Sequence, residues 1–241
     1  MSSPFEIQGA PKENGVLIVV DHASNQIPVG VNLEISSDLM TDHIAQDIGT
    51  TEIAKLMCQE GEYLALLGGY SRLVVDLNRY PDEQNVIPLV SDGVEIPGNQ
   101  IDSQQRSERL SSYFHPYHDR LKQLISEMQP RLLLSLHSFT PNLRTNPGVD
   151  RPWDIGVLYN EYELASKLAL QHLETEEVMA GDQLPYSGKD LNATMNRQAE
   201  AIGQPYFGVE VRQDLISFET GQRRFADILQ RTCDKVLSGL A

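Results

Sequence analysis

Short apolar runs separated by longer amphipathic stretches make up most of the chain. The run Val16 to Val20 is rich in β-branched residues and lies between Gly15 and Asp21, which is the pattern of a strand buried on both faces. Similar runs, each bounded by turn residues or polar stretches, predict further strands at 63–67, 72–75, 131–136, 155–158 and 206–211. Helical periodicity predicts helices at 38–59, 103–128, 161–174 and 218–237.

This alternation of strands and helices predicts an α/β fold with a mostly parallel central sheet. A chain of 241 residues can bury one full core, so a single domain over residues 1–241 is expected. In such a fold, functional groups lie beyond the carboxyl ends of the strands. Residues 142–153 are rich in Pro, Gly and Arg and are interpreted as a mobile loop beside that site.

Charge and composition narrow the range of partners. Nineteen Lys and Arg against 34 Asp and Glu give a net charge of -15, which disfavours nucleic acid and acidic membranes as partners. A small anionic substrate would therefore need a local concentration of Arg or His. Cys58 and Cys233 are interpreted as reduced thiols. The first residues lack a signal-peptide pattern and no apolar run approaches the ~20 residues that span a bilayer, so a cytoplasmic location is expected.

Two histidines follow predicted strands at matching positions. His22 comes just after the 16–20 run, and His137 comes just after the 131–136 run. Imidazole is a common zinc ligand, and a catalytic zinc usually takes three protein ligands and one water. The matched placement favours metal binding by His22 and His137 over a purely structural role.

The third ligand is less evident from the sequence. A His-x-x-Glu pattern would place a carboxylate at position 25, where the chain has Asn25, whose amide oxygen is a weak zinc ligand. Other oxygen donors near in sequence are Asp21, Asp42 and Asp47. Asp47 lies one helical turn after His43, and a hydrogen-bonded pair of these two on a helix face is the preferred interpretation.

The segment 71–79 ends a predicted strand with polar groups suited to an anionic substrate. Arg72 and Arg79 can bind a carboxylate with two hydrogen bonds, and Asn78 adds an amide beside them. The structural alternative is an internal ion pair between Asp76 and Arg79.

Three further residues are candidates for the same site. Glu210 lies in an apolar run, where burial would raise its pKa toward the range of a general base; an ion pair with Arg212 is the alternative. His118, preferred over His115, is a candidate substrate contact on a helix that starts near Pro116. Tyr186 lies in a turn that can carry its phenol into the site, although an ordinary surface turn has the same composition.

Other catalytic classes lack their usual patterns. Neither cysteine has a nearby histidine, and the chain contains no G-x-S-x-G elbow. The phosphate-binding patterns of nucleotide cofactor sites are also missing.

Seven motifs spread over nearly the whole chain resemble the ordered motif set of the N-formylglutamate amidohydrolase family. They are DHASNQIP, TDHIAQDIG, SRLVVDLNR, HPYH, LLLSLHS, PYSG and GVEVRQDL. The family is similar in turn to zinc carboxypeptidases and aspartoacylase. The resemblance implies a zinc-carboxypeptidase-like three-layer α/β/α sandwich around a mixed sheet, and one zinc ion per chain.

The resemblance also implies roles for individual residues. His22, His137 and Asn25 would bind the metal, which activates a water, and Glu210 would take the proton of that water and return it to the leaving amine. Arg72 would polarise the carbonyl oxygen. Substrate binding would fall to Asn78, Arg79, His118 and Tyr186. The departure at Asn25 from a carboxylate ligand implies a more positive and weaker metal site.

The leading hypothesis is hydrolysis of a C–N amide bond in a small N-acylated, for example N-formylated, amino acid or a similar acidic amide. An alternative enzyme is a carboxypeptidase-like or aspartoacylase-like hydrolase of another acyl group. A third possibility is a catalytically weak protein that retains the site and binds a small molecule.

Overall fold

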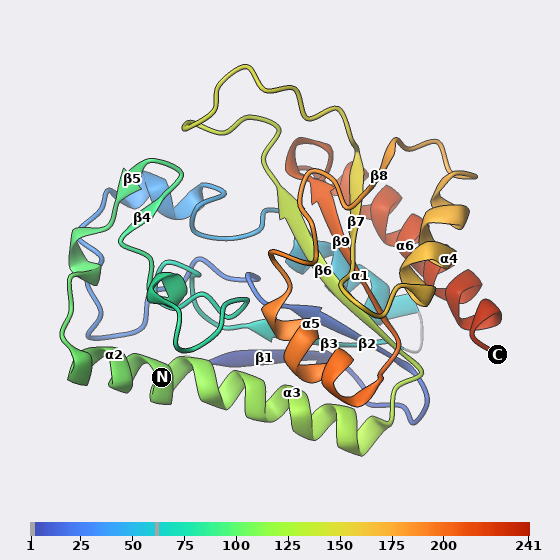
Figure 1. Ribbon diagram of the computed structural model, residues 1–241, viewed down its shortest axis with the longest axis horizontal. Helices are drawn as coiled ribbons and strands as arrows, with labels where there is room; N and C mark the ends of the chain where they lie inside the picture. Colours follow the sequence, from blue (N-terminus) through green and yellow to red (C-terminus); the bar gives the residue numbers. More distant parts are fainter. Residues whose placement is uncertain (1–2, 61–62) are drawn as a thin grey trace.

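A seven-stranded mixed sheet forms the centre of the computed structural model, which describes residues 3–60 and 63–241 (Figure 1). In spatial order its strands are β1 (Phe5–Gly9), β3 (Tyr63–Gly68), β2 (Val16–Val20), β6 (Leu132–Phe139), β9 (Tyr206–Arg212), β7 (Ile155–Leu158) and β8 (Ala180–Asp182). The inner strands β3, β2, β6 and β9 run parallel, whereas β1 runs antiparallel to β3, and β7 and β8, which are parallel to each other, lie antiparallel to β9. The predicted α/β class and mostly parallel mixed sheet are therefore confirmed.

Helices cover both faces of the sheet and complete three layers. One face carries α1 (Thr50–Glu60), α4 (Leu164–Leu173) and α6 (Glu219–Gly239); α1 and α4 each contact α6, and all three contact strands. The other face carries α3 (His115–Met128) and α5 (Ala193–Gln198). The predicted helix 103–128 is continuous, because α2 (Ser103–Arg109) joins α3 through the π-helical turn Leu110–Phe114.

Strand β2 shows why an unbroken apolar run is needed at the sheet centre. Val16, Ile18 and Val20 point into the core beneath α1 and α6, while Leu17 and Val19 point into the core beneath α3. Successive side chains of a strand alternate between faces, so a strand covered on both faces has no polar position.

Smaller elements complete the chain. They are the hairpin β4 (Val90–Ser91) and β5 (Val94–Glu95) and the 3₁₀ turns η1 (Ser37–Thr41), η2 (Gln84–Val86), η3 (Pro97–Asn99), η5 (Glu200–Ile202) and η6 (Gln213–Leu215). The sequence analysis did not predict this hairpin, β1, β8 or α5, all of which are short. Within residues 3–60 and 63–241, the structure contains no helix with the length and apolar character that a membrane crossing requires.

Two predicted elements differ from the structure. The predicted strand 72–75 is a turn, and the predicted helix 38–59 breaks into η1, a turn over residues 42–49, and α1. The break occurs at Gly49, which has a φ of +85° and approaches Ile216 so closely that a Cβ would lie 2.3 Å from its carbonyl oxygen. Such a backbone favours glycine and ends helical periodicity at that point.

The loop between β6 and β7 extends over the carboxyl ends of the strands (Figure 1). Asp92, from the β4–β5 hairpin, joins this loop to the turn that precedes α1. Its carboxylate accepts hydrogen bonds from the Arg144 and Thr145 backbone N–H groups at 2.8 and 3.0 Å, and lies 3.1 Å from His43 Nε2. One buried carboxylate therefore ties together three segments that are distant in sequence.

Candidate metal centre and active-site cavity

Three buried side chains converge at the carboxyl ends of β2 and β6. His22 follows β2, His137 lies in β6, and Asp47 comes from the turn before α1. Asp47 Oδ2 lies 2.8 Å from His137 Nδ1 and 3.3 Å from His22 Nδ1. One ligand atom from each residue lies within 4.8 Å of the other two, so these residues form a group that can hold a metal ion.

The Nε2 atom of each histidine faces a second carboxylate, at hydrogen-bond distance for His22 but beyond it for His137. His22 Nε2 lies 2.7 Å from Asp76 Oδ1, and His137 Nε2 lies 3.7 Å from Asp21 Oδ2. Tyr117 donates a hydrogen bond of 2.8 Å to Asp21 Oδ1 and so fixes that carboxylate. Metal-binding histidines usually donate their other N–H to such a carboxylate, which sets the tautomer and the orientation of the ring. The two histidines are thus oriented with Nδ1 toward Asp47.

The electrostatics of the cluster favour a bound positive charge. Burial and the Arg72 guanidinium lower the pKa of His22, but the carboxylates of Asp76 and Asp47 outweigh them and raise it to about 9. Burial by itself would raise the pKa of Asp47, but His22 and His137 hold it well below its usual range. His137 Nε2 and Asp21 Oδ2 are buried and have no hydrogen-bond partner among the described residues. Two imidazoles and a carboxylate, each oriented by further groups, suit a divalent cation.

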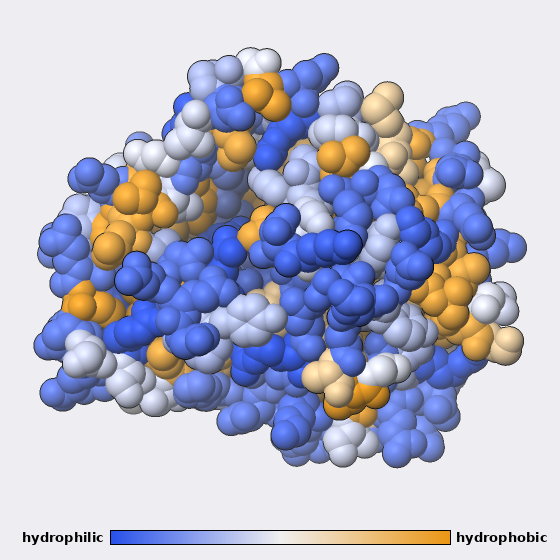
Figure 2. All heavy atoms as spheres, in the orientation of Figure 1, coloured by the Kyte–Doolittle hydropathy of each residue, from blue (hydrophilic) through white to orange (hydrophobic). Residues whose placement is uncertain are grey.

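A cavity of about 220 Å³ opens beside this cluster. It brings together seven residues that the sequence analysis singled out: His22, Arg72, Asn78, Arg79, His137, Tyr186 and Glu210. Its remaining lining residues are His43, Asp47, Ser138, Phe139, Thr140 and Leu191. In the space-filling view, hydrophilic side chains cover most of the visible face and apolar residues form separate small groups (Figure 2). A polar cavity beside a metal-binding group is suited to hydrolytic chemistry on a small polar molecule.

Glu210 lies on β9 directly across from His137 on β6. Burial raises the pKa of Glu210 to about 7, against the opposing effect of the His137 imidazole. The alternative ion pair with Arg212 does not form, because Arg212 Nε instead lies 2.8 Å from Asp214 Oδ1. A carboxyl group whose pKa is near neutrality is suited to take and return a proton.

Arg72 and Arg79 differ in how closely other side chains bind them. Arg72 donates to Asp76 Oδ2 at 2.9 Å and to Asp47 Oδ1 at 3.3 Å, so it supports the carboxylates around the histidines. Arg79 Nε lies 3.8 Å from Asp76 Oδ2, which is too long for a hydrogen bond. Asn78 accepts a hydrogen bond of 3.0 Å from the backbone N–H of Thr194 at the start of α5. Arg79 is therefore the more available of the two guanidinium groups for a ligand in the cavity.

Arg151, which the sequence analysis did not single out by itself, holds Tyr186 in the cavity wall. It is 9% exposed and donates to the Tyr186 phenol oxygen at 2.9 Å and to the Thr140 carbonyl at 2.8 Å. Its guanidinium carbon also lies 4.8 Å from the centre of the Tyr186 ring. The sequence indicated an arginine in a Pro- and Gly-rich loop beside the site, but it could not indicate the partner of Arg151, because Tyr186 is 35 residues away.

The structure does not bring Asn25 into the metal-binding group. Asn25 is partly exposed, and its side-chain oxygen accepts a hydrogen bond from Gln26 at 3.4 Å. Its neighbours Ser24 and Gln26 line a different depression beside β1 and β3. Asp47 provides the third ligand atom of the group instead, and the predicted pair of His43 with Asp47 is wrong, since His43 contacts Asp42 and Asp92.

His118 also lies apart from the residues that line this cavity. It is a buried residue of α3, with Nε2 3.0 Å from the Leu77 carbonyl oxygen. It borders a separate groove between α3 and α5.

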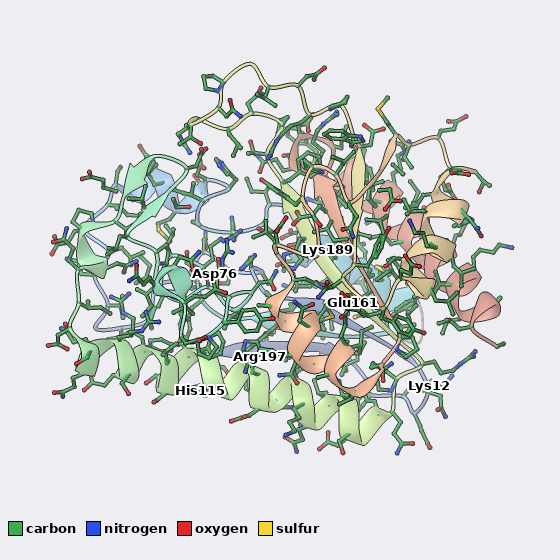
Figure 3. All side chains as sticks on the ribbon, viewed as in Figure 1. Lys12, Asp76, His115, Glu161, Lys189 and Arg197 are labelled. Carbon is green, nitrogen blue, oxygen red and sulfur yellow. The ribbon has the colours of Figure 1, made fainter. Side chains whose placement is uncertain are left out.

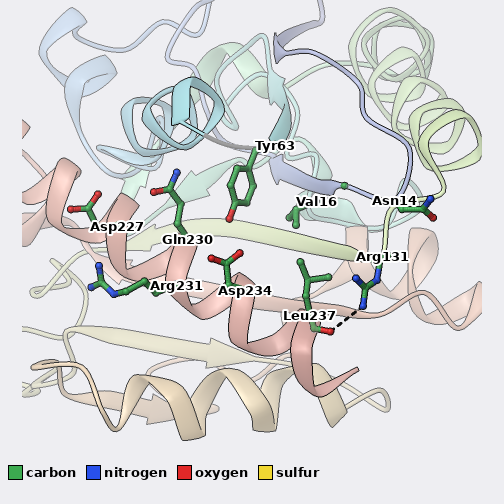
Figure 4. A pocket seen from close by; sticks show the side chains of 10 residues that line it. Asn14, Val16, Tyr63, Arg131, Asp227, Gln230, Arg231, Asp234 and Leu237 are labelled. Atoms are coloured by element: carbon green, nitrogen blue, oxygen red, sulfur yellow. Dashed lines mark hydrogen bonds between the residues drawn. The ribbon is translucent and has the colours of Figure 1, made fainter. Parts of the chain in front are cut away.

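A larger cavity lies at the opposite, amino-terminal end of the strands (Figure 4). It measures about 530 Å³ and is bordered by Asp227 and Asp234 of α6, by Tyr63 and by Arg131, which donates to the Leu237 carbonyl at 3.1 Å. Its lining residues include no histidine, so it lacks the pairing of histidines with carboxylates found in the smaller cavity.

Comparisons with known proteins show the family and the fold. The sequence model of a family described as N-formylglutamate amidohydrolase matches residues 14–217. A crystal structure of a gene product of Agrobacterium tumefaciens, Atu2144, is 30% identical and superposes with a TM-score of 0.92 over 99% of this chain and 96% of that one. An N-formylglutamate amidohydrolase from Ralstonia eutropha is 14% identical and shares the fold, with a TM-score of 0.73 over 98% of this chain and 99% of that one. No curated protein matches the chain.

Proposed function

The chain belongs to the N-formylglutamate amidohydrolase family, and from that premise we propose that it hydrolyses the C–N amide bond of a small N-acylated amino acid or a related acidic amide. We further propose that one zinc ion, held by His22, Asp47 and His137, takes part. The observation that carries the proposal is the arrangement of these three residues beside Glu210 in one polar cavity. Two histidines and one carboxylate are a frequent ligand set of zinc hydrolases.

Zinc bound there would act as a Lewis acid on a water molecule and on the substrate carbonyl group. Glu210 is the proposed general base that takes a proton from the attacking water and returns it to the leaving amine. A pKa of about 7 suits both transfers, because the carboxyl group gains and loses its proton at little cost near neutrality.

The substrate's carboxylate is the proposed ligand of Arg79, with Asn78 beside it. Arg79 is only weakly held by Asp76, and a guanidinium binds a carboxylate with two parallel hydrogen bonds. This local positive charge offsets the overall charge of -15, which by itself repels an anion. Arg72 remains the proposed group at the carbonyl oxygen, and the Tyr186 phenol is a further substrate contact.

The size of the cavity supports a small acyl group. About 220 Å³ is less than the roughly 300–1,000 Å³ of pockets that hold drug-sized ligands. Formyl and acetyl amino acids are therefore favoured over peptides.

The test combines metal content with turnover. Zinc is measured by elemental analysis on the wild type, on Asp47→Asn and on the control Asp214→Asn, an exposed aspartate outside the cavity. Hydrolysis is measured on N-formyl-L-glutamate, N-acetyl-L-glutamate and N-formyl-L-leucine. We expect about one zinc per chain in the wild type and the control, a strong loss in Asp47→Asn, and turnover that follows zinc content. A zinc-replete protein that hydrolyses none of the three amides would refute the proposed reaction.

A further inference from the structure

A groove separate from the active-site cavity lies between α3 and α5. Its volume is about 490 Å³, more than twice that of the active-site cavity. Figure 3 shows Arg197, from α5, and His115, from α3, on the two sides of this junction. Nothing in the proposed reaction uses the polar groups that border the groove.

His118 at the base of the groove offers an unused hydrogen-bond acceptor. Its side chain is 3% exposed, and Nε2 lies 3.0 Å from the Leu77 carbonyl oxygen, so Nε2 carries the proton. Burial lowers the pKa of His118 to about 4, which keeps the ring neutral and leaves a lone pair on Nδ1. Nδ1 is buried and has no partner in the part of the chain that the structure describes. A buried acceptor without a donor is costly, and a ligand N–H or O–H group would remove that cost.

Arg197 offers an unused cation on the other side of the groove. Its guanidinium carbon lies 5.2 Å from the centre of the Phe114 ring, and the His118 ring lies 4.3 Å from the same ring. The Phe114 ring is therefore close to both the His118 ring and the Arg197 guanidinium group. Arg197 Nη1 is buried and, among the described residues, makes no hydrogen bond.

The rest of the lining indicates which ligand fits. Lys122 adds a second cation, Asp119 is a nearby anion, and Ile125 and Ile202 supply apolar surface. Ile202 is 65% exposed and so has apolar area left to bury. On a protein with a net charge of -15, two cations beside unsatisfied polar atoms form a local site for an anion.

We propose that the groove between α3 and α5 binds a small carboxylate with an apolar side chain and an adjacent hydroxyl or amide N–H group. The carboxylate binds Arg197 and Lys122, the O–H or N–H group donates to His118 Nδ1, and the apolar side chain lies against Ile125 and Ile202. This inference does not rest on the proposed reaction, because none of these residues lines the active-site cavity.

The groove is linked to the active-site cavity through Leu77, which contacts His118 and is adjacent in sequence to the cavity residue Asn78. The Leu77 carbonyl oxygen lies within hydrogen-bond distance of both His118 Nε2 and Thr194 Oγ1, and the Thr194 backbone N–H donates to Asn78 Oδ1. A ligand that contacts His118 therefore lies one hydrogen bond away from Leu77, the residue that precedes Asn78 and is also bound by Thr194.

The experiment follows the His118 imidazole of the purified, ¹⁵N-histidine-labelled protein by NMR while 2-hydroxy-4-methylpentanoate is added. This probe has the charge, the donor and the branched side chain but no amide bond. Two comparison probes each lack one feature: 4-methylpentanoate has no hydroxyl group, and methyl 2-hydroxy-4-methylpentanoate has no charge. The variants are Arg197→Gln, Lys122→Gln, the matched control Lys235→Gln on the opposite face, and Arg79→Gln in the active-site cavity.

We expect the His118 Nδ1 resonance to shift with the first probe, and each comparison probe to bind about tenfold more weakly. Arg197→Gln should weaken binding by about tenfold or more, and Lys122→Gln by roughly two- to fivefold, because Lys122 is exposed. Lys235→Gln and Arg79→Gln should leave the binding unchanged. If Arg197→Gln does not fold, Lys122→Gln and the comparison probes still decide the question.

A His118 resonance that stays fixed while those of His22 and His137 shift would show that the probe binds only in the active-site cavity, and would overturn the proposal. Equal binding of 4-methylpentanoate would overturn the assigned ligand class, because the His118 acceptor would then have no role.

Discussion

Replacing Glu210 by glutamine should make the metal-free protein more stable at neutral and alkaline pH. Burial raises the pKa of Glu210 from its ordinary 4.5 to about 7, so the folded protein resists ionisation of this carboxyl group while the unfolded chain does not. Glutamine has nearly the same shape and no ionisable group. The proposed general base is thus expected to reduce the stability of the fold that contains it.

The sign and the size of the effect follow from linkage. The folded state binds the Glu210 proton more tightly, so the contribution of Glu210 to the wild-type free energy of unfolding falls as pH rises from about 4.5 to about 7 and is level above that. A difference of about 2.5 pKa units at about 1.4 kcal/mol each gives roughly 3 kcal/mol, an order-of-magnitude value. His22, Asp47 and Asp76 titrate in both proteins, so the difference between the two stability curves reports Glu210 and its interaction with the neighbouring imidazoles.

The assay is urea unfolding of chelator-treated, dialysed protein at several values between pH 4.5 and pH 8.5. We expect the advantage of Glu210→Gln over the wild type to grow through this interval and to level above pH 7. Glu174→Gln, an exposed glutamate at the end of α4, is the matched control and should show no such trend. A constant difference between Glu210→Gln and the wild type would refute the argument from burial. With zinc restored, the same variant should lose most amidase activity.

Three further predictions concern residues around the site. Asp76→Asn removes the carboxylate that orients His22 and should lower metal affinity about 10- to 100-fold in a chelator competition; equal affinity would show that the contact is incidental. Arg151→Met should reduce kcat/KM about as much as Tyr186→Phe, with no further loss in the double variant, whereas additive losses would separate the two residues. Asp92→Asn should speed protease cleavage within residues 142–153 at pH 7. The Arg144 and Thr145 hydrogen bonds lower the pKa of Asp92 to about 2, although burial alone would raise it, so wild-type cleavage should rise only near that pH. An unchanged cleavage rate in the variant would mean that Asp92 does not hold the loop.

The two histidines of the cluster were found from the sequence because their signal is local. Each follows a run of apolar residues long enough to predict a buried strand, and parallel neighbouring strands bring their carboxyl ends to one edge. Glu210 was found by a different signal, a carboxylate within an apolar run, and the structure pairs its strand with that of His137. The inferences for the two histidines needed only the period of the strands and their direction.

Asp47 was misread because the helical pattern continues on both sides of the turn that carries it. Ile44 and Ile48, and then Ile53 and Met57, are spaced four residues apart, so residues 38–59 looked like a single helix, and Asp47 was assigned to its surface with His43. The turn depends on contacts with residues far along the chain, such as the backbone hydrogen bond from Asp47 to His22 and the close approach of Gly49 to Ile216. Periodicity read from neighbouring residues in the sequence cannot indicate contacts with residues far along the chain.

The approach of Gly49 to Ile216 also bears on how this site could be engineered. It presses the turn that carries Asp47 against the segment that follows β9, the strand of Glu210, with no side chain between the two backbones. A designer who grafted only the two histidines, Asp47 and Glu210 onto another scaffold would copy the reactive groups without the backbone contact that spaces them. The smallest transferable unit is therefore two main-chain segments held at a fixed separation, and position 49 in it has to remain glycine.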